Sequence, residues 1–410
     1  MEMKKYKLGE IADIIVGYPF ESAKFNTDGN GVLLVRGMNV SERFLRFGDE
    51  ARYWNYITDD LKPYYLKEND IVIGMDGSKV GKNFALVKKE DLPLVLVQRV
   101  ACIRAKKDYD QRYIWQYVSS KRFIEYVNTI KTGSSIPHIS GNQISNFPIF
   151  VPDLQSQQKI ASVLSSLDDK IALNRLMNAK LEQMAKRLYD YWFVQFDFPG
   201  ANGKPYKSSD GKMVWNEELK REIPDGWEVK SIFDAADVIY GFPYATEPFD
   251  ENVQESNNPY SIIRIRDILE NSISAKTTES VDDKYKTKIG DLLIGMDGYF
   301  HMNFWSRDND YVNQRIVRIR KKDVSTLILY HQVLPFIKFK EEKAKGSTVG
   351  HLSDKDMKQI RVLIPNNKNL NVKFDTILSM MMARRQENLK LTAMRDKLLP
   401  LLINGQVVVE

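Results

Sequence analysis

Apolar side chains follow a repeating pattern of steps of four and three residues in two stretches of the chain. The first series runs from Ile160 to Trp192, and its ten positions alternate these steps throughout. The mean period of 3.5 residues is typical of a coiled-coil seam rather than of a general amphipathic face. Adding 210 to each number gives a second series, from Leu370 to Leu402. We therefore predict two long helices.

The seam positions are the side chains that we expect to bind the other helix or a partner subunit. In the first helix they include Leu164, Leu167, Ile171, Asn178, Leu181 and Leu188, and in the second Phe374, Ile377, Asn388, Leu391 and Leu398. Asn178 and Asn388 occupy equivalent places, and a buried Asn in a seam costs stability but fixes register and partner choice. The alternative is that each helix only covers its own β-domain.

Elsewhere the pattern changes to short runs of β-branched and aromatic residues between Gly, Asn and Asp turns, which predicts strands. Pro152 and Pro365 precede the two helices, and residues 197–222 are polar with several Gly turns. The predicted fold class is α+β, with two β-rich domains related by pseudo-two-fold symmetry and separated by the long helices. The predicted order is a domain at 1–152, a central helix at 153–196, a linker at 197–222, a domain at 223–366 and a C-terminal helix at 367–404.

Four short segments of the first β-rich part recur in the second. Residues 12–20 return at 236–244, 70–77 at 291–298, 98–100 at 314–316, and 133–140 at 346–353. All four matches fall in the same order, and their offsets shrink from 224 to 213. One such match could arise by chance, but four collinear matches indicate a tandem duplication.

Composition narrows the class of protein without deciding it. The 410 residues are enough for two or three cores, and the net charge of +6 permits a polyanionic partner without demanding one. Cys102 is the single cysteine and stands in an apolar run, so we expect a buried strand residue and a cytoplasmic protein. No stretch reaches the length of an apolar membrane helix, so no membrane association is expected.

Two domains held at a fixed distance by long helices could bind two DNA sites that are separated by a fixed distance. Each seam would span on the order of 50 Å at ~1.5 Å per residue. DNA half-sites lie about 34 Å apart, or a multiple of that distance. Two similar but unequal domains on such a spacer predict an asymmetric target in two parts.

Several segments resemble the specificity subunits of type I restriction-modification systems. They are residues 160–192, 203–209, 223–228 and 395–402, and the resemblance covers nearly the whole chain. It implies that the β-rich domains are target recognition domains for double-stranded DNA and that the helices form an antiparallel coiled coil. It also implies binding of two methyltransferase subunits and of restriction subunits. S-adenosylmethionine, ATP and Mg would be bound by those partners, with no cofactor in this chain.

Two loops and two arginines are the candidates for DNA contact. The residues concerned are Ser78, Lys79, Lys82 and Asn83 after the first repeated turn, Tyr299, His301 and Asn303 after the second, and Arg36 and Arg264 at matching strand ends. Lysine mainly contacts phosphate, Asn and His can bind base edges, and arginine is the usual bidentate partner of guanine. The alternatives are two ordinary hairpin loops and two arginines in structural salt bridges.

Segments that are the same in both copies favour a shared role over base discrimination. The Gln98-Arg99 and Gln314-Arg315 pairs predict a structural or phosphate-binding role. The repeated Gly-Ser turns that end in His138 and His351 predict a structural role, with a phosphate contact as the alternative.

We expect neither a catalytic residue nor a metal site in this chain. Asp168 and Lys170 imitate nuclease spacing, but they stand two residues apart on a predicted helix and point in divergent directions. The four histidines are too scattered in sequence for a metal cluster. The competing hypothesis is a duplicated coiled-coil scaffold that does not bind DNA.

Overall fold

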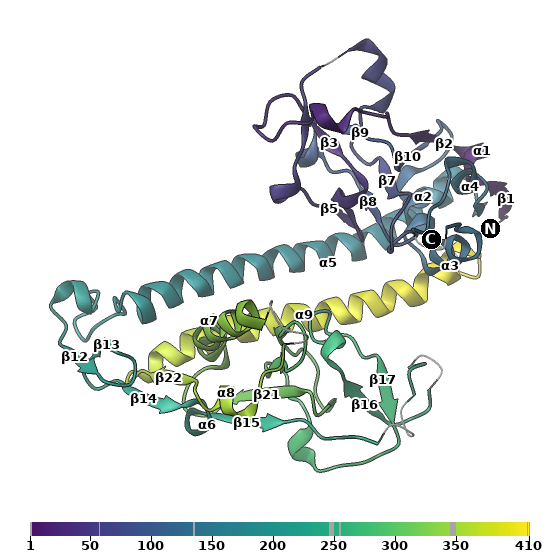
Figure 1. Ribbon diagram of the computed structural model, residues 1–410. Coiled ribbons are helices and arrows are strands. Elements are labelled where there is room, and N and C mark those ends of the chain that lie inside the picture. The colour runs from purple at the N-terminus through teal and green to yellow at the C-terminus, as the bar shows by residue number, and fades with distance from the viewer. Residues whose placement is uncertain are drawn as a thin grey trace. The chain divides into compact units, whose positions relative to one another are not determined.

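The computed structural model describes residues 2–56, 58–133, 136–245, 250–253, 256–344, 350–407 and 409. The chain forms two compact units, Met1–Lys170 with Leu391–Glu410 and Ile171–Lys390. Each unit joins one β-rich domain to segments of both long helices (Figure 1). Because the helices are divided between the units, this partition does not test the domain boundaries predicted above.

The first unit is built around a four-stranded antiparallel sheet in the order β2-β10-β7-β8. Its strands are β2 (Ala12–Val16), β10 (Val100–Ala105), β7 (Ile71–Gly74) and β8 (Phe84–Leu86). A second sheet contains β6 (Tyr53–Trp54), β3 (Val32–Val35) and β9 (Leu94–Leu96), with β3 antiparallel to β6 and parallel to β9. Two strand pairs complete it, namely β1 (Lys4–Lys7) with β11 (Pro148–Val151), and β4 (Val40–Ser41) with β5 (Phe44–Leu45).

The second unit repeats this topology. The four-stranded sheet has the order β15-β21-β18-β19, made of β15 (Ala236–Tyr240), β21 (Ile316–Lys321), β18 (Leu292–Gly295) and β19 (Met302–Phe304). The three-stranded sheet contains β17 (Ala275–Thr277), β16 (Tyr260–Ile263) and β20 (Tyr311–Val312), again with one antiparallel and one parallel neighbour of the middle strand. Strand β14 (Glu228–Ser231) pairs with β22 (Arg361–Ile364), as β1 pairs with β11. The same sheet orders in both units confirm the internal duplication.

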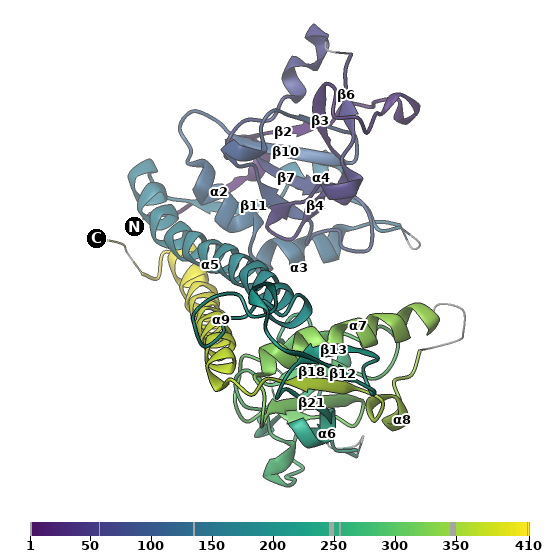
Figure 2. The same ribbon diagram turned by 90° about the vertical axis from the view of Figure 1, so that its left-hand side faces the viewer.

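Further helices belong to both units. The first unit has α1 (Leu8–Ile11), α2 (Gln111–Val118), α3 (Lys121–Ile130) and α4 (Gly141–Ser145), and the second has α6 (Ile232–Ala235), α7 (Thr326–Ala344) and α8 (Asp354–Met357). Helix α4 begins at a capping box in which Ser140 and Gln143 bond each other's backbone N–H, and α8 begins in the same way at Ser353 and Asp356. One helix, α7, takes the place of the pair α2 and α3, and it contacts β21 and β22. Figure 2 shows α7 in the same domain as β18 and β21.

The stretch predicted as a linker carries structure of its own. Strands β12 (Met213–Asn216) and β13 (Arg221–Pro224) form an antiparallel hairpin. Before the hairpin, the end of the central helix widens into a π-helical turn (Asp190–Val194), and its Phe193 packs on Trp227 at 5.2 Å between ring centroids. Aromatic packing therefore ties this connection to the second domain.

The two long helices are α5 (Leu154–Tyr189) and α9 (Lys368–Ile403). In the second unit Asn174 Nδ2 donates to Asn388 Oδ1 at 2.9 Å, and Asn178 Nδ2 donates to the carbonyl of Met381 at 3.2 Å. The partner number falls as the α5 number rises, so the helices run antiparallel there. All ten seam positions of each series are buried or half-buried. The predicted α+β fold and the antiparallel coiled coil are confirmed.

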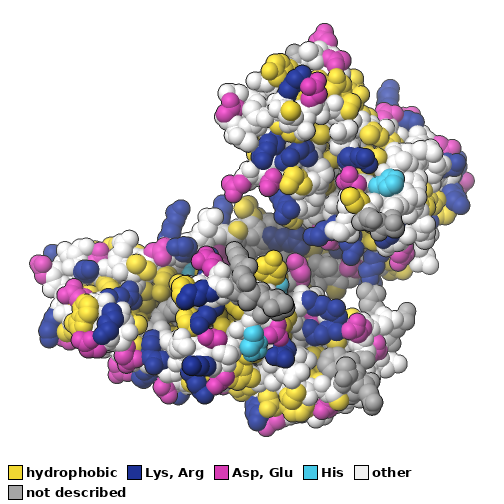
Figure 3. All heavy atoms as spheres, viewed as in Figure 1, with side chains coloured by type: hydrophobic (Ala, Val, Ile, Leu, Met, Phe, Trp, Pro, Cys, Tyr) yellow, Lys and Arg dark blue, Asp and Glu magenta, His cyan; other side chains and the backbone are white. Residues whose placement is uncertain are grey.

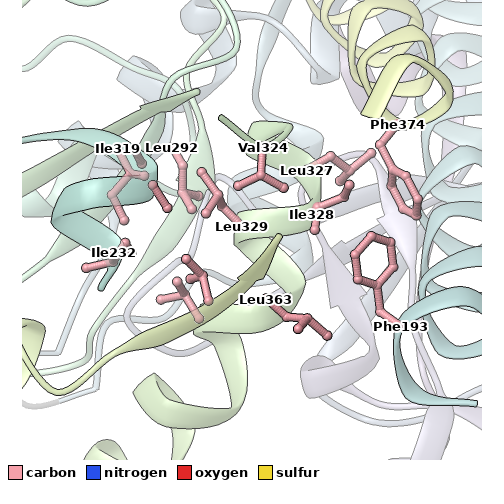
Figure 4. Close-up of a cluster of buried hydrophobic side chains, with 14 of the residues drawn as sticks. Phe193, Ile232, Leu292, Ile319, Val324, Leu327, Ile328, Leu329, Leu363 and Phe374 are labelled. Atoms are coloured by element: carbon pink, nitrogen blue, oxygen red, sulfur yellow. The ribbon is translucent and has the colours of Figure 1, made fainter. Parts of the chain in front are cut away.

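The helix seam continues directly into the core of the second domain. Phe374 on α9 lies edge-to-face with Phe193 at 5.9 Å between centroids. Figure 4 shows these two rings beside Leu327 and Ile328 of α7, with Leu292 further into the domain. In the first unit Leu164 of α5 and Leu402 of α9 likewise belong to the core that contains α2 and α3. Burying these apolar side chains is the main force that holds each domain on its helices.

Two further expectations concern single residues and membrane association. Cys102 is buried in β10, as predicted, and burial raises the pKa of its thiol. Among the described residues, no helix combines the length and the apolar character that a membrane span requires.

Candidate nucleic-acid interface

The four repeated segments meet at one end of the four-stranded sheet in each unit. In the first unit β2 and β7 end there and β10 begins there, because neighbouring strands are antiparallel. Backbone hydrogen bonds join the segments, from Met75 N–H to the carbonyl of Arg99 at 2.8 Å and from Ile139 N–H to the carbonyl of Met75 at 2.8 Å. We call the set Gly17, Asp76, Arg99 and His138, and in the second unit Gly241, Asp297, Arg315 and His351, the sheet-end cluster.

The same backbone contacts hold the second sheet-end cluster. Met296 N–H donates to the carbonyl of Arg315 at 2.9 Å, and Leu352 N–H donates to the carbonyl of Met296 at 2.7 Å. A glycine is required where the strands meet, because a Cβ atom on Gly17 would lie 2.2 Å from the carbonyl oxygen of Val97 and one on Gly241 would lie 2.1 Å from that of Asn313. Much of the repeated sequence therefore serves to close this end of the sheet.

The histidines of the two clusters have the same place but different partners. His138 and His351 pair through backbone bridges with Asp76 and Asp297. His351 Nδ1 lies 2.7 Å from Asp297 Oδ1, whereas His138 Nε2 lies 3.0 Å from the hydroxyl of Thr132. The backbone bridges agree with a structural role for these turns. Their Gly-Ser portions at 134–135 and 346–348 lie outside the described residues.

The first predicted DNA-contacting loop leaves the sheet end and returns into β8. Ser78, Lys79 and Lys82 are exposed, and Val80 is buried as an anchor in the core. Asn83 is half-buried, and its carbonyl accepts from Gly74 N–H at 2.8 Å. The loop thus presents two ammonium groups and a hydroxyl to solvent.

The second loop is three residues shorter, because His301 takes the place that Asn83 has in the first. The carbonyl of His301 accepts from Gly295 N–H at 2.8 Å. Phe300 is the buried anchor, and the Tyr299 side chain is 69% exposed and stacks on His301 with ring centroids 6.1 Å apart. An aromatic pair therefore stands where the first domain has lysines.

Asn303, the last residue predicted for this loop, lies in strand β19. Its Nδ2 donates to the carbonyls of Ile268 at 3.1 Å and Leu269 at 2.9 Å, and its Oδ1 accepts from Arg385 Nη1 at 2.8 Å. These bonds occupy both ends of the amide. Sequence alone could not separate it from the loop, because the strand begins only one residue before it.

Arg36 and Arg264 do lie at matching strand ends, after β3 and β16. Each residue's N–H donates to a side-chain oxygen three residues later, at 3.0 Å and 2.9 Å. Arg36 Nη2 donates to the carbonyl of Glu50 at 2.6 Å, and Arg264 donates through Nε and Nη2 to Ser274 and pairs with Glu251. Both guanidinium groups are thus held within their own domains, and burial lowers the pKa of Arg36. Guanine binding by these arginines stays a prediction.

The arginines of the sheet-end clusters face solvent instead. Arg99 is 65% exposed and Arg315 is 55% exposed, and each is near the aspartate of its cluster. The sequence left a structural role and phosphate binding open for both arginines, since their exposure depends on the tertiary structure. Basic and acidic side chains are interspersed over each unit on the face that Figure 3 shows, so charge alone does not mark an interface there.

Ionic contacts, half-buried in the first unit and partly exposed in the second, fasten each domain to the helices. In the first unit Asp168 Oδ1 accepts from Arg43 Nη1 at 2.9 Å and from Arg395 Nη1 at 3.0 Å. Burial lowers the pKa of Arg43, and Asp168 opposes that shift. In the second unit Arg385 on α9 bonds Asn303 and the carbonyl of Phe304 and pairs with Glu182 on α5. Asp168, which imitates a nuclease residue in sequence, is therefore part of an ion-pair group between elements.

Among the residues that the structure describes, no three His, Cys, Asp or Glu side chains are placed to hold a metal ion. His331 lies on α7 and stacks on Tyr189 at 4.9 Å between ring centroids. Burial lowers its pKa to about 4, so the ring is neutral at neutral pH.

Comparison with known proteins decides the family. The family model described as "Type I restriction modification DNA specificity domain" matches residues 1–183 and 224–390, which is most of the chain. The chain belongs to this family. Its description names DNA specificity, and the relatives given next are named specificity subunits. The chain is therefore a specificity subunit, a non-catalytic role in which it recognises DNA, as the resemblance in sequence implied.

Individual relatives agree with the family model. The MjaIX specificity subunit of a type I restriction enzyme from Methanocaldococcus jannaschii is 27% identical over 78% of this chain and 74% of its own length. The HindI specificity subunit from Haemophilus influenzae is 24% identical over 72% of this chain and 77% of its own length. The crystal structure of a type I S subunit from M. genitalium has a TM-score of 0.54 at 17% identity, covering 98% of this chain and 96% of that one, and shows the same fold.

Proposed function

We propose that this specificity subunit recognises one asymmetric DNA sequence in two separated parts, with each recognition domain binding one part. The observation that carries the proposal is the contrast at the sheet-end clusters. Both domains have the same sheet order and the same backbone contacts there, yet the loops that leave them differ in length and chemistry. Equal frameworks with unequal loops are what two different half-sites require.

The side chains of the two loops fit different kinds of contact. Lys79 and Lys82 are exposed cations that would bind phosphate, and Asn83 beside them offers an amide for a base edge. Tyr299 and His301 offer stacked rings and an imidazole instead. A domain with the first set and a domain with the second set would select different bases.

The long helix α5 supports the proposal that two methyltransferase subunits bind this chain. Within the second unit, apolar residues outside the seam recur on one face of α5 at intervals of four and seven residues. They are Leu173, Met177 and Met184, and Tyr191 continues the spacing in the π-helical turn after α5; all four are exposed. Exposed apolar surface of this kind marks protein-binding sites. The restriction subunits would join the same complex, and S-adenosylmethionine, ATP and Mg would be bound by these partners.

A scaffold without DNA binding accounts for the helices equally well, but it gives no reason for paired loops of different chemistry. The family match also favours DNA recognition over the scaffold. Binding of duplex DNA that weakens steeply with salt separates the two hypotheses, because each neutralised phosphate releases counterions.

The experiment that tests the proposal is co-expression with the methyltransferase subunit of the same system, followed by methylation-sensitive sequencing of host DNA. We expect a methylated, asymmetric, two-part motif that disappears when this chain is deleted. A stable complex that methylates no such motif would contradict the proposal.

A further inference from the structure

We propose that Arg99 and Arg315 contact the phosphate backbone of DNA, one in each recognition domain and independently of base sequence. The inference rests on the proposed function, because it assigns residues to the DNA contact of the same protein. It goes beyond that function by separating the side chains that hold DNA from those that would distinguish bases.

Both arginines stand at the tip of a tight turn that enters the central strand of the sheet. Arg99 precedes β10 and Arg315 precedes β21, and each carbonyl is fixed by the backbone bond from Met75 or Met296. Arg99 lies in the left-handed region, with a φ of 69°. The backbone is thus held in place while the side chain extends into solvent.

Each arginine meets the aspartate of its cluster through the same pair of atoms. Arg99 Nε is 3.9 Å from Asp76 Oδ2, and Arg315 Nε is 3.4 Å from Asp297 Oδ2. These distances are long for an ion pair, and exposed pairs of this kind contribute little to stability. Among the described residues the Nη atoms of both arginines have no hydrogen-bond or ion-pair partner, so the terminal fork is available.

Other arginines in the same sheets show what a structural pair looks like in this protein. Arg104 and Arg320 each donate through both Nε and Nη2 to the two oxygens of Asp70 and Asp291, at 2.6 to 2.9 Å. Both aspartates are buried. The sheet-end arginines lack this bidentate geometry and this burial, although they are repeated just as faithfully.

Both domains keep an arginine at this place although it makes no strong structural bond. A ligand that both domains bind explains why. The bases of two different half-sites differ, so side chains that select bases should differ between the domains. The phosphates are the same in both half-sites, and the planar arginine fork matches phosphate in a bidentate way. Arg99 and Arg315 keep one chemistry while the neighbouring loops change, which fits phosphate contact.

The test is the salt dependence of DNA binding by the complex of this chain with its methyltransferase subunit. The probe is a fluorescent duplex of random sequence, and anisotropy gives the affinity over a series of salt concentrations. We expect the slope of log affinity against log salt to shrink by about 0.9 in Arg99→Gln and in Arg315→Gln, and by twice that in the double variant. The methylated motif in cells should keep its sequence.

Two controls separate a local contact from net charge and from folding. Lys220→Gln removes one exposed cation from the β12–β13 hairpin and should leave the slope unchanged. Arg99→Lys and Arg315→Lys keep the charge and should retain most of the slope, even if the glutamine variants prove unstable to heat. A structural arginine would not be rescued in this way.

The inference is wrong if the folded double glutamine variant keeps the wild-type slope, or if Lys220→Gln lowers the slope equally. It is also wrong if the lysine variants lose the slope as the glutamine variants do. A wild-type complex that binds the duplex without salt dependence would instead contradict the proposed function itself.

Discussion

Asp168 lies on α5 between Arg43 and Arg395, and one of its carboxylate oxygens accepts from both. The three side chains are largely buried, so on folding their contacts with water are replaced by contacts with one another. We predict that Asp168→Asn destabilises the first unit by about 3 kcal/mol, because Arg43 loses its carboxylate partner in a largely buried place, whereas Arg395 keeps its pair with Asp396. Thermal unfolding of the full chain measures the loss.

Asp169 provides the matched control, because it is the next residue of the same helix and is exposed. Asp169→Asn should leave the unfolding temperature nearly unchanged. Equal unfolding temperatures of the Asp168 and Asp169 variants would show that the ion-pair group adds nothing.

Side-chain roles at the residue scale could be predicted only in part. The matching places of Arg36 and Arg264 follow from the duplication, and the structure has both at strand ends. Their bonds to Glu50 and Ser274 could not be foreseen, since these partners are brought close only by folding. The exposure of Arg99 and Arg315 could not be predicted either, because it depends on which residues folding brings close to them.

At the scale of elements, the long helices were the most predictable part. A 3.5-residue period is a local property, and it predicted 153–196 where the structure has α5 at Leu154–Tyr189 followed by a π-helical turn. The widened end reflects packing of Phe193 on Trp227, a contact between distant residues. The replacement of α2 and α3 by α7 could not be predicted from the sequence either, because the four repeated segments do not include these helices.

The apolar face of α5 gives a prediction about assembly. Leu173→Lys combined with Met177→Lys places two charges on this exposed face, and we expect the chain to lose its methyltransferase subunit during co-purification. Thermal unfolding and DNA binding of the chain should be unchanged, since neither residue belongs to the buried seam.

Ala179→Lys adds a charge to the same helix on a different exposed face and should keep the complex intact. If the Leu173 and Met177 double variant retains the methyltransferase subunit, that subunit does not bind this face of α5.

At the scale of the whole molecule, the duplication predicts modular recognition. Replacement of residues 1–152 by the recognition domain of another specificity subunit should change one part of the methylated motif and leave the other part intact. The physical reason is that each domain has its own sheets and its own loops at the sheet-end cluster. Sequencing of methylated host DNA measures both parts at once, and a change in both would refute modular recognition.

The order of domains and helices, the duplication and the family were all accessible from sequence, because they depend on period and repetition. The division of the chain into two compact units could not be predicted from the sequence. It depends on which segments of the long helices share a core with which domain, and on contacts such as those of Leu399 and Leu402 with the first domain.

The first unit is completed by a segment from the far end of the chain. The hydroxyl of Tyr117 donates to the carbonyl of Ile403 at 3.0 Å, and residues 391–410 belong to this unit although 171–390 form the other. A ribosome makes the chain from its N-terminus, and domains generally fold in the order in which they emerge. The first domain must therefore wait, with part of its apolar surface uncovered, until every residue of the second unit has been synthesised.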